Sequence, residues 1–159
     1  MIMELKNTHK PIDYSDSMKI LEKRVKDVFN GKKDELLWIL EHKTVYTAGT
    51  SSKNEDVLDR KLKILKTNRG GKHTLHAPGQ KVIYFVLNLN KRERDIRVLV
   101  QKVEKCIIRI LKTYKIESHS DRKNIGIWVK NNNNSMKIAA IGIRVKKWIA
   151  YHGFSINVN

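Results

Sequence analysis

The chain has 159 residues, of which 33 are lysine or arginine and 16 are aspartate or glutamate, so its formal net charge is +17. Hydrophobic residues make up 40% of it, too many for global disorder, and a single cysteine excludes an intramolecular disulfide and a zinc site built from thiolates. No apolar stretch approaches the roughly 20 residues of a membrane span, and Met1–Lys10 lacks the apolar core of a secretory signal. We therefore expect one soluble, cytoplasmic domain over residues 1–159, whose basic surface attracts an acidic protein or a nucleic acid and not a membrane.

The first half of the chain predicts one helix and three strands. Residues 18–28 carry apolar side chains at helical spacing, and a glycine follows as a stop signal. Residues 36–40 and 44–47 are short β-prone runs, and residues 81–87 have the apolar, β-branched and aromatic composition of a buried strand. The polar segment 50–62 has no sustained period and predicts an exposed loop.

The second half predicts another helix and three more strands. Apolar residues recur at helical spacing over residues 96–110, which indicates a helix docked by one face. Strand-like runs at 125–129 and 137–145 flank an asparagine run at 131–135, which predicts a hairpin loop, and a last strand is expected over 147–151 before an extended tail. This order lacks a regular β-α-β alternation. It predicts an α+β fold with a mixed, largely antiparallel sheet and flanking helices.

Cys106 and the three tryptophans lie in apolar runs. Cys106 falls among isoleucines in the middle of the second helix, which is typical of a small core hydrophobe, whereas a reactive thiol favours an electropositive, partly open position. Trp38, Trp128 and Trp148 are also expected inside, and aromatic residues make up only 7% of the chain. Nucleic-acid binding is therefore disfavoured, because it needs aromatic side chains on an exposed strand face.

The segment 69–80 holds the densest set of residues that can carry chemistry. Its paired glycines let a ligand approach the backbone, Arg69 and Lys72 add positive charge, and His76 can donate a hydrogen bond or move a proton. Its spacing matches neither a P-loop nor a dinucleotide-binding fingerprint, and two histidines without further ligands do not indicate a metal site. Composition alone equally allows a glycine-rich turn that leads into the strand at Lys81.

Lys137 is a second candidate, because it opens a run of small and apolar residues. A lysine that is partly desolvated there would give up its proton more readily, which suits proton transfer. The alternative is an ordinary lysine at a strand end with its ammonium group in water. The small residues that follow leave room for a bound chain against the backbone.

Several ordered motifs together resemble the octanoyltransferases of protein lipoylation. The motifs are Leu-Glu-His-Lys-Thr-Val-Tyr-Thr-Ala-Gly-Thr at 40–50, Arg-Gly-Gly at 69–71 with Thr74, His76 and Pro-Gly-Gln at 78–80, Gly-Ile-Trp-Val at 126–129, Lys-Ile-Ala-Ala-Ile-Gly-Ile-Arg-Val at 137–145, His-Gly-Phe at 152–154 and Asn-Val-Asn at 157–159. The resemblance covers essentially the whole chain. It implies the fold that this family shares with lipoate and biotin protein ligases.

The resemblance implies transfer of an octanoyl group without a metal or cofactor. A cysteine thiolate takes the group from acyl carrier protein, and the amine of a lysine in a lipoyl domain or in the glycine-cleavage H protein then attacks the thioester. Lys137 matches the family's catalytic lysine, which lowers the pKa of that thiol and moves protons. The resemblance assigns substrate binding to Arg69, Gly70, Gly71, Lys72, His73, Thr74, Leu75, His76, Ala140, Ile141, Gly142, Gly153, Phe154 and Ser155.

The sequence departs from the family's pattern at three points. Leu75 stands where the family usually has tyrosine, and Ala77 stands where it usually has glycine. The family's nucleophilic cysteine lies a short stretch beyond the motif at 157–159, and Cys106 does not match it. We therefore expect a catalytic domain that is incomplete at its C-terminus, shapes the pocket and lacks the nucleophile.

Three other functions stay open at this point. The first is an inactive fragment, the second is a lipoate or biotin ligase that needs ATP, and the third is a basic nucleic-acid-binding module. The segments 76–80 and 152–154 favour the transferase over the ligase.

Overall fold

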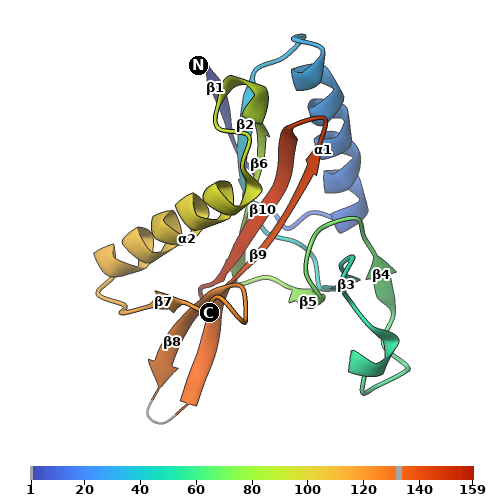
Figure 1. The fold of residues 1–159 in the computed structure, drawn as a ribbon. Coiled ribbons are helices and arrows are strands. Elements are labelled where there is room, and N and C mark those ends of the chain that lie inside the picture. The colour runs from blue at the N-terminus through green and yellow to red at the C-terminus, as the bar shows by residue number, and fades with distance from the viewer. Residues whose placement is uncertain (1, 132–133) are drawn as a thin grey trace.

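The computed structural model describes residues 2–131 and 134–159 and shows a large sheet beside a small one (Figure 1). In spatial order, the strands of the seven-stranded sheet are β1 (Met3–Asn7), β2 (Glu35–Leu40), β6 (Gln80–Asn88), β10 (Ile149–Asn157), β9 (Asn134–Lys146), β8 (Ile127–Asn131) and β7 (His119–Ser120). Those of the three-stranded sheet are β4 (Ile64–Lys66), β3 (Val45–Ala48) and β5 (His73–His76). Neighbouring strands are antiparallel apart from the parallel pairs β1–β2 and β3–β4. The predicted α+β fold with a largely antiparallel sheet is confirmed.

The two helices cover opposite faces of the large sheet (Figure 1). α1 (Tyr14–Phe29) shares one buried cluster with the even-numbered residues 82, 84 and 86 of β6, whereas α2 (Ile96–Thr113) shares a second cluster with Phe85. Because successive side chains of a strand point to opposite faces, β6 is buried on both sides. Asp95 caps α2 by accepting hydrogen bonds from the N–H groups of Arg97 and Val98. No helix in the described part of the chain is both long enough and apolar enough to span a membrane.

A tight turn joins β9 to β10 where the sequence predicts the start of the last strand. Lys147 and Trp148 have φ angles of 52° and 61°, as the primed hairpin turns require. The predicted strand at 147–151 is therefore wrong at its start. It is also too short, because Gly153, expected in an extended tail, lies within β10. The site depends on this longer strand.

Four strands lie in segments for which the sequence predicts none: β1, β4, β5 and β7. β5 occupies part of the glycine-rich segment, and β4 follows the exposed loop, in which residues 54–56 form the single turn η1 (Asn54–Asp56). β8 and β9 form the expected hairpin. Its predicted loop at 131–135 includes residues 132 and 133, which lie outside the described residues.

The expected burial of Cys106 and of two tryptophans is wrong. Cys106 is exposed because it lies beside, not on, the buried stripe of α2 that Val103 and Ile107 form. Trp38 is buried, but Trp148 in the β9–β10 turn is 37% exposed and Trp128 is half-buried. A run of apolar residues in the sequence does not show which face of a helix or strand packs against the core.

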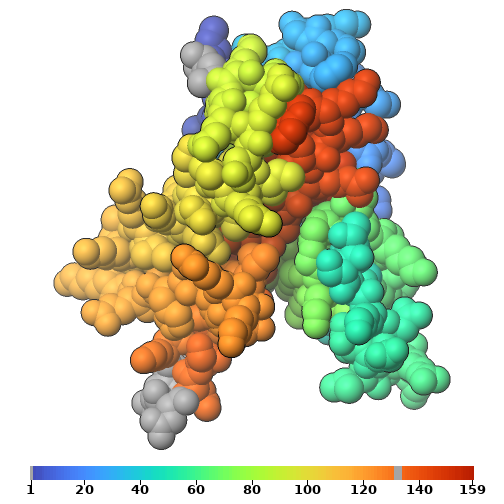
Figure 2. Space-filling model, viewed as in Figure 1, coloured from blue at the N-terminus to red at the C-terminus, as the bar shows by residue number. Residues whose placement is uncertain are grey.

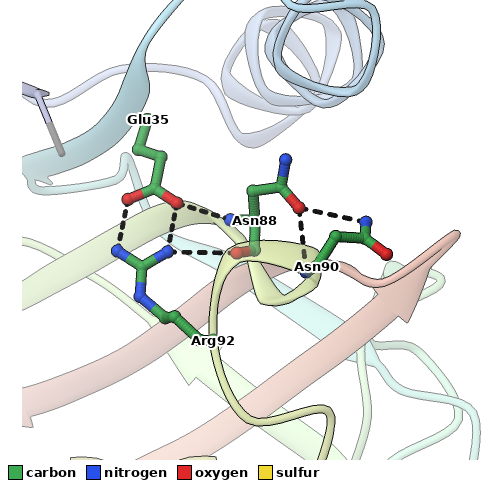
Figure 3. Close-up of polar contacts among 4 residues, drawn as sticks. All are labelled: Glu35, Asn88, Asn90 and Arg92. Carbon is green, nitrogen blue, oxygen red and sulfur yellow. Dashed lines mark hydrogen bonds and ion pairs between the residues drawn. The ribbon is translucent and has the colours of Figure 1, made fainter.

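Glu35 ties the start of β2 to the end of β6 and to the 3-10 helix η2 (Leu89–Lys91) (Figure 3). Its carboxylate accepts hydrogen bonds from both Nη atoms of Arg92 and, at 2.7 Å, from the backbone N–H of Asn88. Arg92 also donates to the carbonyl of Asn88, whose side-chain oxygen accepts two bonds from Asn90. The Glu35 side chain is 6% exposed and that of Arg92 is 27% exposed, so the carboxylate is the buried partner of this ion pair.

Arg92→Ala is expected to lower the free energy of unfolding by about 2 kcal/mol, because it leaves the Glu35 carboxylate buried without its counter-ion. The matched control is Lys19→Ala, which breaks an exposed ion pair with Asp16 and should change stability by less than about 0.5 kcal/mol. Urea unfolding measures both variants. Equal effects would contradict a structural role for the Glu35–Arg92 pair.

Candidate functional site

A groove of about 840 Å³ lies between the small sheet and the β8–β9 end of the large sheet. Figure 2 shows it as the hollow between the green part of the chain and the orange part. One wall comes from residues 69–75 and 77–80, and the other comes from residues 123–125, Lys137 and residues 140–143 of β9. Segments far apart in the sequence therefore face each other across one cavity.

Small residues let the two walls meet at the base of the groove. A Cβ placed on Gly70 would lie 2.9 Å from the carbonyl oxygen of Ile143, and one on Gly142 would lie 3.1 Å from that of Gly70. Arg144 adds a hydrogen bond of 2.7 Å from its Nη1 to the carbonyl of Asn68. The Arg-Gly-Gly segment is thus pressed directly onto the backbone of β9, which explains why glycines stand on both walls.

Arg69 holds its loop to the small sheet. Its Nη2 donates to the carbonyl and the hydroxyl of Thr47 at 3.0 and 2.8 Å, and its Nη1 donates to the carbonyl of Gly70 at 2.9 Å. Burial lowers the pKa of this guanidinium from its usual value. The terminal nitrogens are thus engaged by the protein, so Arg69 shapes the groove more than it offers charge to a ligand.

Three exposed lysines supply the positive charge of the groove: Lys72, Lys123 and Lys137. Lys137 Nζ donates to the carbonyl of Ile125 at 3.0 Å and lies 4.8 Å from the ring centroid of Trp128. Of the two alternatives for Lys137, the structure favours the lysine with its ammonium group in water, because the side chain is exposed, although it does line the groove. None of the described residues that line the groove is an aspartate or a glutamate. The cavity is therefore suited to a ligand with an anionic part.

A second, small cavity of about 40 Å³ adjoins the groove and shares six lining residues with it. His76 and His152 both line this cavity and are buried. Burial is the main cause that lowers the pKa of His76 to about 4 and that of His152 to about 3, with the charge of Arg69 acting in the same direction. Both imidazoles are therefore neutral near pH 7.

His152 reaches this cavity because its backbone departs from the regular strand. Its φ is +67°, which is uncommon for a residue other than glycine. Side chains of neighbouring strand residues normally alternate between faces, yet the rings of Tyr151 and His152 stack with centroids 4.8 Å apart. His152 Nε2 lies 2.8 Å from the side-chain oxygen of Asn68, in the loop of the other wall.

The structure brings all the predicted site residues to these two cavities. The groove is lined by Arg69, Gly70, Gly71, Lys72, His73, Thr74, Leu75, Lys137, Ala140, Ile141, Gly142 and Ser155. The small cavity is lined by His76, Gly153 and Phe154, together with some of the same residues.

Sequence reasoning missed the buried polar residues behind the groove. His42 Nε2 accepts a hydrogen bond of 2.8 Å from the hydroxyl of Tyr84, and the ring of His42 lies 5.5 Å from that of His76. Tyr84 in turn lines the small cavity. The only local signal was that His42 belongs to the motif at 40–50. Tyr84 lies in a run that reads as an ordinary buried strand.

Comparison with known proteins identifies the family. The profile of the lipoyl protein ligase A/B catalytic domain matches residues 13–159. The chain belongs to this family. It is 45% identical to an octanoyltransferase of Wolbachia pipientis wMel over 92% of this chain and 72% of that protein. It is also 41% identical to an octanoyltransferase of Ehrlichia chaffeensis over 99% of this chain and 75% of that protein. The resemblance to octanoyltransferases is confirmed, and with it an acyltransferase of protein lipoylation.

Solved structures support the same fold. The chain superposes on a T. acidophilum protein described as a lipoate protein ligase, solved with bound lipoic acid, with a TM-score of 0.73. The match covers 99% of this chain and 68% of that one at 16% sequence identity. Lipoate-protein ligase A bound with ATP matches with a TM-score of 0.66 at 14% identity, over 99% of this chain and 67% of the ligase. At such identities the likeness concerns the fold alone.

Proposed function

We propose that the groove binds an octanoyl group, and that this protein transfers it from octanoyl-acyl carrier protein to a lysine of lipoyl domains through a cysteine thioester. The glycine-cleavage H protein is a further proposed acceptor, and the cytoplasm is the proposed compartment. The observation that carries the proposal is the groove itself, which is lined both by the small and apolar residues 140–143 and by three lysines. A structural analysis of a bi-partite lipoate protein ligase and its E2 lipoyl domain from Thermoplasma acidophilum includes a chain of the same fold, which supports a lipoyl-domain acceptor.

The reaction balances with Lys137 as the proposed proton carrier. A thiolate attacks the carbonyl of the octanoyl carrier, a new thioester forms, and the carrier leaves as a thiolate. The acceptor amine then forms the amide, and the C–S bond of the thioester breaks. The proton that the amine loses passes through Lys137 Nζ to the leaving sulfur. The proposed substrate-binding residues are 69–76, 140–142 and 153–155, which line the groove or its boundary with the small cavity.

Cys106 is not the proposed nucleophile. It is exposed on α2 and does not line the groove. Because the chain has one cysteine, the thioester is assigned to a cysteine outside these 159 residues. Binding of the acyl carrier is therefore the step of the reaction that can be tested with this chain alone.

The chain is expected to bind octanoyl-acyl carrier protein about tenfold or more tightly than the unacylated carrier, because each buried methylene contributes about 0.8 kcal/mol. Lys123→Glu should weaken binding, since it reverses a charge at the groove. Lys112→Glu is the matched control, with the same change in net charge at an exposed position on α2 outside the groove. Titration calorimetry measures the affinity of the wild-type chain for both forms of the carrier and the affinity of each variant for the octanoyl form.

Two results would contradict the proposal. Equal affinities for the acylated and unacylated carriers would show that the groove does not take the acyl chain. A hydroxylamine-labile octanoyl adduct on this chain, found by intact mass, would contradict the assignment of the nucleophile to a cysteine other than Cys106.

A further inference from the structure

Three residues that line the small cavity each have a buried polar atom without a hydrogen-bond partner in the described part of the chain. These atoms are Arg69 Nε, His76 Nε2 and His152 Nδ1. The three residues are 7%, 6% and 1% exposed, so bulk solvent does not satisfy them. Buried polar atoms in folded proteins are nearly always paired, either with protein or with ordered water.

The hydrogen-bond network fixes which of these atoms donate and which accept. Gln80 Nε2 donates to two carbonyl-type oxygens, so Gln80 Oε1 accepts and His76 Nδ1, 2.6 Å away, carries the proton. Asn68 Nδ2 donates to Glu22, so Asn68 Oδ1 accepts and His152 Nε2 carries the proton. His76 Nε2 and His152 Nδ1 are consequently acceptors, whereas Arg69 Nε is a donor.

Water fits this set of atoms better than a cation does. A cavity of about 40 Å³ has room for two or three waters, because one water needs roughly 10–15 Å³. A water oxygen can accept from Arg69 Nε while its two hydrogens bind the two histidine acceptors. An ammonium group has no acceptor for Arg69 Nε, and it would lie beside the guanidinium charge.

The small cavity is also the inner boundary of the groove. Both cavities are lined by Arg69, Thr74, Ala140, Ile141, Gly142 and Ser155. A chain that passes beyond these shared residues would enter the small cavity and displace what its polar atoms bind. Those atoms would then be buried without partners, which is unfavourable.

We propose that ordered water in the small cavity bridges Arg69, His76 and His152, and that this water is a polar stop against which an aliphatic chain in the groove ends. The stop rests on the proposed acyl-binding function, whereas the water site does not. The site is a specificity device, because it limits the length of acyl chain that the groove accepts.

The water is tested on the whole chain labelled with 15N-histidine. Long-range 1H–15N spectra should show His76 protonated on Nδ1 and His152 protonated on Nε2. Nuclear Overhauser contacts should link both rings to a long-lived water, whereas the exposed His9 and His119 serve as references for bulk solvent. Reversed tautomers, or rings without long-lived water contacts, would overturn the water site.

The stop is tested by adding octanoyl-pantetheine or dodecanoyl-pantetheine. Both should shift the resonances of groove residues and leave the water contacts intact, and the longer chain should bind no more tightly. Tighter dodecanoyl binding with loss of the water contacts would overturn the stop and leave the function standing. If octanoyl-pantetheine shifts no groove resonance, the proposed function and the stop both fail, whereas the water site stands on its own spectra.

Discussion

Acidification from pH 7 to pH 5 is expected to lower the free energy of unfolding by about 4 kcal/mol. The cause is the set of buried histidines behind the groove. Burial lowers the pKa of His76 to about 4 and that of His152 to about 3, and it also lowers the pKa of His42. Unfolding returns each imidazole to a pKa near 6.5.

The sign follows from the proton balance. Below about pH 6.5 the unfolded chain binds protons at these histidines, whereas the folded protein does not until the pH falls to about 4 or below. Stability is therefore lost as the pH falls, at about 1.4 kcal/mol per pH unit for each histidine that stays neutral in the fold. The positive charges of Arg69 and Arg144 lower the pKa of His152 in the same direction as burial. They therefore add to the cost of protonating this imidazole in the folded protein.

Urea unfolding at several pH values between 7 and 5 measures this slope. His152→Asn should reduce the slope by about 1.4 kcal/mol per pH unit, because asparagine tolerates the left-handed backbone and does not titrate. His119→Asn, at an exposed position, is the control and should leave the slope unchanged. A stability that does not change with pH in wild type, or a slope unaffected by His152→Asn, would show that these histidines are not buried in neutral form.

The spacing of apolar residues along the chain predicted most of the fold. The spacing of Leu21, Val25 and Val28 predicted α1, because one face of that helix is buried. The continuous apolar run predicted β6, because both faces of that strand are buried. The resemblance to octanoyltransferases pointed to residues of both cavity walls, whereas composition alone left the segment 69–80 open between a ligand site and a turn. Register, in contrast, depends on partners. The turn at 147–148 and the full length of β10 follow from pairing with β9 and β6.

The buried polar cluster could not be predicted in this way. His42, His76 and His152 lie far apart in the sequence. They come together only because the segment after β2 is brought next to β5 and β5 next to β10. The positive φ that turns His152 toward the cavity has no local signature. Cys106 shows the reverse error, since its apolar neighbours suggested burial while its position on the helix faces solvent.

Gly153→Ala is expected to destabilise the protein by about 4 kcal/mol, which is at the extreme of single substitutions. An added Cβ would lie 2.0 Å from the carbonyl oxygen of Ile83 and 3.1 Å from its carbonyl carbon. These atoms belong to the backbone of β6, which pairs with β10 along its whole length. Relief of the overlap therefore requires the two central strands to separate. This would happen next to His152, whose side chain lines the small cavity.

Gly31→Ala is the matched control, because it adds the same methyl group where nothing lies within 4 Å. Its φ of +68° follows the end of α1, so the only cost is that of a left-handed alanine, about 1 kcal/mol. Urea unfolding compares the two variants, and hydrogen exchange of the β6 and β10 amides locates the damage. If both variants lose the same stability, the close approach of β10 to β6 at Gly153 does not constrain the fold. If hydrogen exchange in Gly153→Ala rises only near α1, the added methyl group does not push β10 away from β6.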